Sequence, residues 1–424
     1  MSILIKNATI IDKNSNFNGL KKDILVKEGK IIQIENEIVA EGVQLIHSTN
    51  LHVSPSWADI RADFCEPGNE QRENLHSGSL VAMAGGFVYV SLVSSTNPTV
   101  FQSTTLEFIQ NKVKNLPVQL LPYACITKES KGEQLAEMYD VYTSGARLFS
   151  DDLQSLSSGI VYRALLYSKI FNGKLVLFCR NPFLSKSCQV NEGLASLKTG
   201  LKGEPTIAES IDLDRYLSLL EYTDAQLHIS GISCASSLNK IIEAKKKGLK
   251  VTVDVHIDNL LFNEEKVFDF NQNYKVLPVL RREEDRLALI EGVNNNWIDG
   301  IASNHRPFTK EDTEVEFDDA PFGNIHLQTF FPELLSLFPL EKCIEILSFQ
   351  NRLICSVPPS TIQIGNIADL TCFDPSLKWI FNEESNLSKS INSPFFNNEL
   401  TGKALATVHQ HKNSVNLDHL PHIL

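Results

Sequence analysis

The feature that most constrains this chain is an alternation of short apolar runs with helical stretches between about residues 52 and 350. Most of these runs lack a strict apolar–polar alternation, which is typical of parallel strands buried on both faces. Amphipathic patterns such as 213–223 and 236–248 lie between them. Seven or so such units predict an α/β fold, a (β/α)8 barrel of the TIM type. The strand candidates are 87–94, 118–126, 146–150, 174–179, 225–230, 250–255 and 298–303.

Both ends of the chain are rich in strand patterns outside this alternation. Residues 2–50 contain short alternating segments separated by Gly and Asn, and strand patterns return after about 355. We expect residues 1–51 and 355–424 to pair into one small composite β-sandwich domain. The barrel would then occupy residues 52–354.

Composition limits the partners and the cellular compartment that are expected for this chain. The 424 residues carry a net charge of -12, which disfavours nucleic-acid and anionic-membrane partners. No apolar run approaches about 18 residues, so no membrane span is expected. The first residues alternate like a strand and lack a signal-peptide layout. The eight cysteines are scattered without a CxxC pair, which indicates free thiols in the reducing cytoplasm.

A series of motifs in fixed order gives the chain a family resemblance. Residues 55–68 read PSWADIRADFCEPG, and further motifs follow over most of the chain. They include SGSLVAMAGGFVYV (77–90), STNP (95–98), FSDD (149–152), GLKGEPTIAES (200–210), LPVLRREEDRLAL (277–289), IDGIASNHRPF (298–308), DDAPFGNIHLQ (318–328) and IGNIADLTCFDP (364–375). Together they resemble the dihydroorotases of the amidohydrolase superfamily, in particular the long type associated with aspartate transcarbamoylase.

The resemblance implies one or two zinc ions at the C-terminal mouth of the barrel, held by histidines and carboxylates. Such a metal acidifies a water that opens the dihydroorotate ring, or supports the reverse closure of carbamoyl aspartate. Carried over residue by residue, the ligands are missing. The histidine positions fall on Arg61, Asp63, Phe178 and Gly231, and the aspartate of the TDH motif falls on Asn304.

Asp151 and Asp152 are the residual members of the implied metal set, and His305 is the one histidine left at a functional position. Asp258 and Asn259 stand where the resemblance implies a histidine pair. The positions implied to bind substrate are also changed: Cys65 and Ser95 early in the barrel, and Leu277 and Phe308 late in it.

The substitutions predict that the zinc site is lost and that no metal cofactor binds. Zinc held by one carboxylate would be lost to water, and Arg61 would place a permanent cation at the metal position. We expect Arg61 to pair with Asp63, Asp151 or Asp152. This pairing would compensate carboxylates that would otherwise be buried without a partner.

Other candidate groups have simpler interpretations. His305 is expected to be a core histidine rather than an acid or base, and Cys65 and Cys179 to be inert thiols. His228 and His256 could form a new metal site with Asp254 or Asp258, although their spacing matches no recognised ligand set. Surface histidines are the expectation for the C-terminal group: His409, His411, His419 and His422.

Three functional hypotheses remain. The first is a catalytically inactive dihydroorotase-like protein of pyrimidine biosynthesis, an oligomer and by family analogy a dimer, with a structural or regulatory role as a partner of aspartate transcarbamoylase. The second is an active or altered cyclic amide hydrolase that uses a reshaped site: Arg61, Asp63, Asp151, Asp152 and His305. The third is a binding module in which Arg61 holds a carboxylate ligand such as dihydroorotate.

Overall fold

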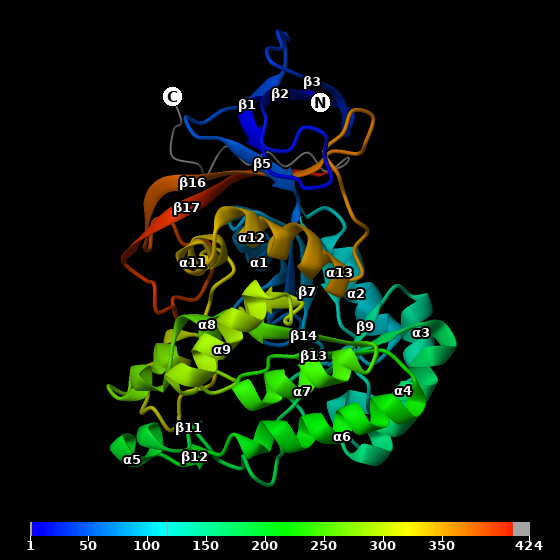
Figure 1. Cartoon of the computed structure of the whole chain (residues 1–424), viewed down its shortest axis with the longest axis vertical. Coiled ribbons are helices and arrows are strands. Elements are labelled where there is room, and N and C mark those ends of the chain that lie inside the picture. The colour runs from blue at the N-terminus through cyan, green and yellow to red at the C-terminus, as the bar shows by residue number, and fades with distance from the viewer. Residues whose placement is uncertain (1, 117, 410–424) are drawn as a thin grey trace.

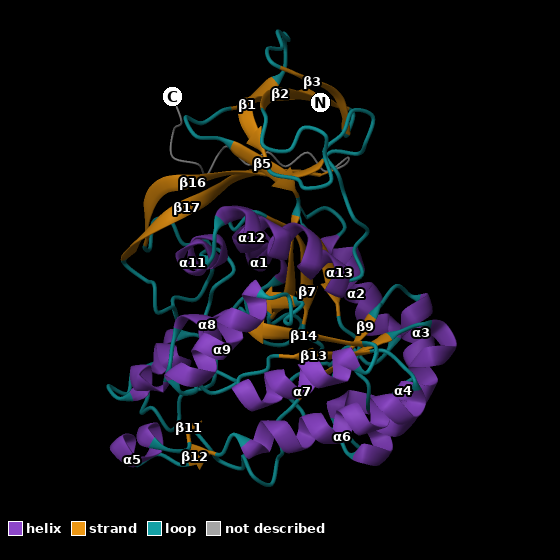
Figure 2. Ribbon diagram, viewed as in Figure 1, coloured by secondary structure: helices purple, strands orange, loops and turns teal. Residues whose placement is uncertain are grey.

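The computed structural model describes residues 2–116 and 118–409. A three-stranded and a five-stranded parallel sheet form the wall of a barrel (Figures 1 and 2). Isolated bridges, Ala62 to His305 and Ala124 to Phe149, join the two sheets at both seams. The first sheet contains β6 (Trp57–Ala62), β7 (Phe87–Leu92) and β8 (Gln119–Pro122). The second contains β9 (Leu148–Phe149), β10 (Lys174–Phe178), β13 (Leu227–Ser230), β14 (Val251–His256) and β15 (Gly300–Ala302).

Helices follow the barrel strands and cover their outer faces (Figure 2). Side-chain caps define several starts: Asn74 accepts from the Ser77 amide before α1, and Ser157 accepts from the Ile160 amide before α4. The helices are α1 (Leu75–Ala84), α2 (Ser103–Val113), α3 (Met138–Thr143), α4 (Ser158–Phe171), α5 (Leu194–Thr199), α6 (Ile207–Thr223), α7 (Ala235–Lys246), α8 (Ile257–Leu261), α9 (Glu283–Asn294), α10 (Lys310–Thr313), α11 (Phe330–Leu337), α12 (Leu340–Glu345) and α13 (Asn351–Ile354). A short two-stranded ribbon, β11 (Val190–Asn191) with β12 (Gly203–Glu204), flanks α5.

Strands from both ends of the chain share one seven-stranded sheet, at the top of Figure 1. Its order is β17-β16-β5-β1-β2-β3, with β4 on β1, and the antiparallel pairing of β5 with β16 joins the N-terminal strands to the C-terminal ones. The strands are β1 (Ser2–Ile10), β2 (Lys21–Lys27), β3 (Lys30–Glu35), β4 (Gln44–Ile46), β5 (His52–Pro55), β16 (Asp369–Phe381) and β17 (Asn398–His409).

An aromatic cluster attaches this sheet to the barrel. The buried Trp57 ring lies 5.3 Å from Phe373 of β16 and 4.7 Å from Phe331 of α11, measured between ring centroids. Buried aromatic side chains contribute large apolar areas, so the first barrel strand and the terminal sheet share one core. Within the described parts of the chain, no helix combines the length and apolarity required to cross a membrane.

Candidate functional site at the barrel mouth

Asp152 forms ion pairs with two arginines at the carboxyl ends of the barrel strands. Arg61 lies on β6 and binds Asp152 Oδ1 through Nη2. Arg306 follows β15 and places its Nη2 2.8 Å from Oδ2, which also accepts from the Ser95 hydroxyl at 2.7 Å. Arg61 is 1% exposed and Asp152 6% exposed. Of the three carboxylates considered for Arg61, the structure selects Asp152.

The two guanidiniums determine the ionisation of Asp152. Burial opposes the charged form, but Arg306 and Arg61 outweigh it and hold the pKa of Asp152 well below its usual range. A carboxylate in such a state is a weak base, and both of its oxygens already accept hydrogen bonds.

Asp151 faces a different set of groups from its neighbour. Its carboxylate accepts from the Ile126 amide at 2.7 Å, the Thr127 amide at 3.1 Å and the Thr127 hydroxyl. Burial raises the pKa of Asp151, and these hydrogen bonds oppose the increase. Asp151 therefore fixes the loop after β8, and Asp152 alone meets the arginines.

Asn304 and Asp63 have local bonding roles. Asn304 accepts from Arg61 Nε at 3.0 Å and donates to the Leu277 carbonyl at 3.4 Å. Asp63 accepts from the Cys65 amide at 2.7 Å in the turn after β6. Burial raises the pKa of the Cys65 thiol, so this side chain stays protonated. The same holds for Cys179, whose pKa burial also raises.

The imidazole of His256 packs against Gly231. A Cβ at Gly231 would lie 2.7 Å from His256 Cε1 and Nε2, and the glycine has φ +68°. His256 bonds the Leu277 carbonyl through Nδ1 at 3.0 Å, so Nδ1 carries the proton. Burial lowers the pKa of His256 to about 4, although Asp254 opposes this. A neutral imidazole therefore fills space beside the position at which the resemblance implies a histidine.

Gly231→Ala is expected to destabilise the fold by roughly 2–4 kcal/mol, the sum of left-handed strain and a clash with a buried ring. Gly200→Ala is the matched control, because Gly200 also has positive φ (+74°) but a Cβ there would have no heavy atom within 4 Å. Urea unfolding should give a loss for the control of only about 1–2 kcal/mol. Equal losses in both variants would contradict the packing of His256 on Gly231.

His228 and His256, the two histidines considered for a new metal site, both lie at Asp254, and His256 Nε2 is 3.9 Å from Asp254 Oδ1. His228 binds Asp254 at 2.8 Å through Nε2, and Asp254 also accepts from the Gly231 amide at 2.7 Å. Asp258 instead pairs with His326 at 2.9 Å. Among residues 2–116 and 118–409, no group of three or more His, Cys, Asp and Glu side chains has the arrangement of a metal site.

Apolar side chains gather beside the group formed by Arg61, Arg306 and Asp152, called here the arginine cluster. Phe178, Leu277 and Val279 are buried together, with Leu153 and Phe322 packed against them. Asn259, next to Asp258, donates to the Val279 carbonyl at 3.2 Å and so supports the same segment. Phe178 belongs to this cluster and Phe308 does not.

Phe308 packs against the Arg72 guanidinium, whose Cζ atom lies 4.8 Å from the Phe308 ring centroid.

The segment 318–328, which resembles a substrate-closing loop, is held in place by hydrogen bonds with Lys275. Lys275 Nζ donates to the carbonyls of Phe317 at 2.5 Å and Asp318 at 3.0 Å, and the Gly323 amide donates to Lys275 O at 2.8 Å. The segment therefore lies closed against residues 272–275.

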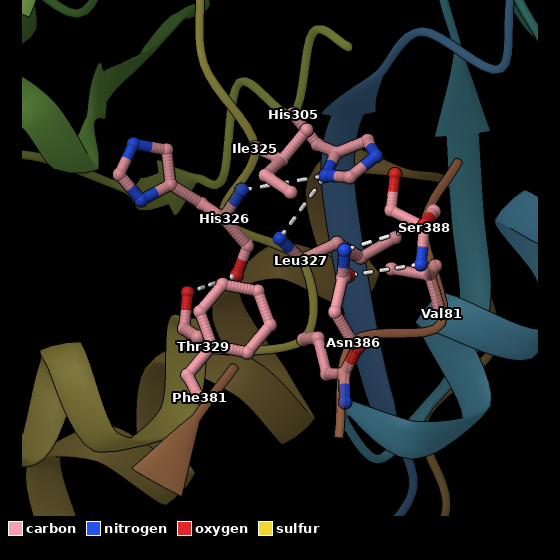
Figure 3. A pocket seen from close by; sticks show the side chains of 10 residues that line it. Val81, His305, Ile325, His326, Leu327, Thr329, Phe381, Asn386 and Ser388 are labelled. Carbon is pink, nitrogen blue, oxygen red and sulfur yellow. Dashed lines mark hydrogen bonds between the residues drawn. The ribbon is translucent and has the colours of Figure 1, made fainter. Parts of the chain in front are cut away.

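His305 is held by backbone groups rather than by a catalytic partner (Figure 3). Its Nδ1 accepts from the amides of His326 and Leu327, both at 3.3 Å. Burial lowers the pKa of His305 to about 3, with a further contribution from His326. The ring is neutral, carries its proton on Nε2 and lies edge-on to Phe64 at 6.3 Å between ring centroids.

Sequence reasoning missed two functional features. Arg306 occupies the alanine position of the HAPH-like motif, and the reading HRPF was the available signal. His326 is the second: its Nε2 lies 2.9 Å from Asp258, and its Nδ1 lies 2.9 Å from Glu333. Burial disfavours the charged ring, but Glu333 and Asp258 outweigh burial and raise the pKa of His326 to about 10. No motif spacing indicated this buried cation.

His409 departs from the expectation of a surface histidine. Its side chain is 11% exposed, and Nδ1 lies 3.0 Å from Asp369, which also binds Arg352 at 2.8 Å. His409 therefore belongs to a partly buried ion cluster between β16 and β17. The other three histidines of that group, His411, His419 and His422, lie outside the described residues.

Comparison with known proteins agrees with the resemblance in sequence. A family model described as "Dihydro-orotase-like" matches residues 52–237. A curated protein of Aquifex aeolicus named dihydroorotase is 36% identical over 416 residues, covering 96% of this chain and 98% of its own length. One of Bacillus subtilis with the same name is 33% identical over 416 residues, with 96% and 97% coverage.

Solved structures give the same fold. The L-hydantoinase of Arthrobacter aurescens superposes with a TM-score of 0.83 at 20% identity, covering 96% of this chain and 95% of that one. At this identity the likeness concerns the fold, and it confirms the α/β barrel with an adjoining β-domain. The relatives that align over nearly the whole chain establish the family: this chain belongs to the dihydroorotase family of the amidohydrolase superfamily.

Proposed function

We propose that this chain is a non-catalytic member of the dihydroorotase family that serves pyrimidine biosynthesis in the cytoplasm as a structural or regulatory partner of aspartate transcarbamoylase. The observation that carries the proposal is the pairing of Asp152 with both Arg61 and Arg306. Two fixed cations already compensate the carboxylate that the family resemblance assigns to the metal.

The residues at the mouth do not fit a zinc ion. Zinc requires three or four nitrogen, sulfur or oxygen donors at about 2.0–2.3 Å. The implied ligand positions instead supply Arg61, Asp63, Phe178, Gly231 and Asn304. Of the carboxylates, Asp63 accepts from the Cys65 amide and Asp152 is already paired with both arginines. A divalent cation beside two guanidiniums would also meet strong repulsion. Hydroxide chemistry of the zinc-dependent kind has no support in this donor set.

A second candidate, an altered cyclic amide hydrolase, is favoured by the name dihydroorotase on relatives at 33–36% identity. The local chemistry weighs against it. Asp152 is held ionised by its arginines, and His305 is neutral and held by backbone amides. The apolar cluster of Phe178 and Leu277 further reduces polar space beside them. We therefore rank the non-catalytic role first.

The catalytic part is tested by dihydroorotate–carbamoyl aspartate interconversion with excess Zn²⁺ supplied. The expected result is no turnover above background, with the Aquifex aeolicus relative as the positive control in the same assay. Metal analysis after dialysis should give far less than one zinc per chain. Clear zinc-dependent turnover would overturn the non-catalytic assignment and favour the hydrolase.

The partner part needs a separate measurement. The chain and the aspartate transcarbamoylase of the same organism, purified separately, are expected to co-elute as one complex in size-exclusion chromatography with light scattering. The chain alone is expected to elute as a dimer. Independent elution of the two proteins at micromolar concentrations would remove the partner assignment while leaving the catalytic result untouched.

A further inference from the structure

A cavity of about 550 Å³ lies where β8 and β9 separate at the N-terminal side of the barrel. The two strands meet only near their other ends, where the Ala124 amide donates to Leu148 O at 3.0 Å and the Ser150 amide donates to Ala124 O at 2.8 Å. Below that bridge β8 pairs with β7 alone. The seam between the two barrel sheets is therefore open at its base.

The wall of this cavity is mainly apolar. Side chains of α2 and β8 supply most of it, including Leu106, Val113 and Leu120, and Leu148 adds the start of β9. Its volume falls in the range of about 300–1,000 Å³ that holds small-molecule ligands. An apolar wall of this size suits an apolar ligand body.

The charged residues among the described lining are both basic: Lys114 and Arg147. Lys114 follows the last turn of α2 and Arg147 precedes β9, so the two cations come from different elements of the lining. The whole chain, in contrast, carries a net charge of -12. This local sign reversal favours an anionic group over a cationic or neutral one.

Arg147 is held in place before any ligand arrives. Its Nη1 donates to the carbonyls of Tyr142 at 3.0 Å and Ala146 at 2.9 Å, and its guanidinium lies 4.5 Å from the Tyr142 ring centroid. Gln110, another lining residue, is fixed by a 3.1 Å hydrogen bond from its Nε2 to Ser144 O. Preorganised polar groups at the rim of an apolar cavity give a ligand a defined orientation.

We propose that this cavity binds a small amphipathic anion, with its apolar body between α2 and β8 and its carboxylate or phosphate head at Lys114 and Arg147. The site is separate from the mouth, but the same strands connect them. β8 leads to Thr127, which holds Asp151, and β9 leads to Asp151 and Asp152. A ligand bound between the N-terminal ends of β8 and β9 would therefore affect the segments that position Asp151 and Asp152.

The test is a fluorescence titration of the full chain with 1-anilinonaphthalene-8-sulfonate, followed by competition with decanoate and with octyl phosphate. Saturable binding of one probe per chain is expected, with displacement by at least one of the two anions. The competitor that displaces at lower concentration identifies carboxylate or phosphate as the preferred head. The uncharged N-phenyl-1-naphthylamine should bind about tenfold more weakly.

Variants locate the site. Arg147→Gln and Lys114→Gln should each weaken binding about tenfold, and Gln119→Trp should abolish it by filling the opening. Arg147→Lys, which keeps the charge, should stay within about threefold. Lys131→Gln, at a lysine 63% exposed elsewhere, is the charge-matched control and should not change the affinity. Unsaturable binding, equal affinity for the uncharged probe, or equal effects of Arg147→Gln and the control would each overturn the proposal.

Discussion

Asp152→Asn is expected to lower the free energy of unfolding by about 3–5 kcal/mol, because it leaves the buried Arg61 guanidinium without its counter-charge beside a second cation. Arg61 is 1% exposed, and its remaining polar partner is the neutral Asn304 amide. Asparagine keeps the shape of the side chain and tolerates the positive φ of 55° at this position. The loss therefore reports charge rather than packing, and urea unfolding measures it.

Two further variants make this result interpretable. Arg61→Met combined with Asp152→Asn should recover most of the loss, because the uncompensated buried cation is removed as well. Asp214→Asn is the control, because it breaks an exposed ion pair: the side chains of Asp214 and Lys240 are 54% and 31% exposed. It should lower the free energy of unfolding by less than about 1 kcal/mol. If Asp152→Asn cost no more than this control, the arginines would not depend on Asp152 for their compensation.

Raising the pH from 6 to above 10 is expected to remove on the order of 4 kcal/mol of stability through His326. The folded pKa of about 10 lies above the unfolded value of 6.5. The contribution of His326 is therefore fully present below pH 6.5 and is lost as the pH rises through 10. The cause is the placement of a buried imidazolium between Glu333 and Asp258, which outweighs the cost of burial.

The His326 contribution is isolated by comparison with Glu333→Gln. This variant removes the carboxylate that contributes most to the raised pKa, so the loss of stability should be smaller and should be complete at lower pH. Burial also lowers the pKa of Lys275 to about 8, which makes stability rise with pH above 8. Both proteins contain Lys275, so subtracting the pH profile of unfolding free energy of Glu333→Gln from that of the unmodified chain removes its contribution. Identical pH profiles for the two proteins would contradict the His326 assignment.

Imidazole ¹⁵N spectra at pH 8 give an independent check. His326 should carry protons on both nitrogens, whereas His256 and His305, with pKa values lowered to about 4 and 3, should be neutral. Loss of the doubly protonated signal in His326→Gln would assign it. A neutral His326 at pH 8 would remove the basis of the pH prediction.

The barrel could be predicted because the sequence patterns that indicate its strands each lie within one short segment. The run 174–179 is apolar without strict alternation, as expected for a strand covered on both faces, and the run 250–255 has three valines within a strand-length segment. These runs correspond to β10 and β14 in the structure. The loss of the family's ligand residues was equally local, since each position could be compared with its motif. Neither inference needed the distance between any two side chains.

The replacement for those ligands could be predicted only in part. Arg61 was a visible cation, but choosing among Asp63, Asp151 and Asp152 required the turn after β9, where Asp151 faces Thr127 and Asp152 faces the mouth. Arg306 was visible as a departure from the motif, yet its partner lies 154 residues away in sequence. Sequence alone does not give the direction of adjacent side chains in an irregular turn.

The sequence by itself determined the fold class, the family and the absence of histidines at the implied ligand positions, because periodicity and motif spacing are properties of short segments. Only the tertiary structure decided how the remaining charges are compensated: Asp152 with Arg61 and Arg306, and His326 with Asp258 and Glu333. It also decided that β8 and β9 separate at their bases. Charge compensation and cavities depend on distances between segments remote in the chain, which closure of the barrel sets.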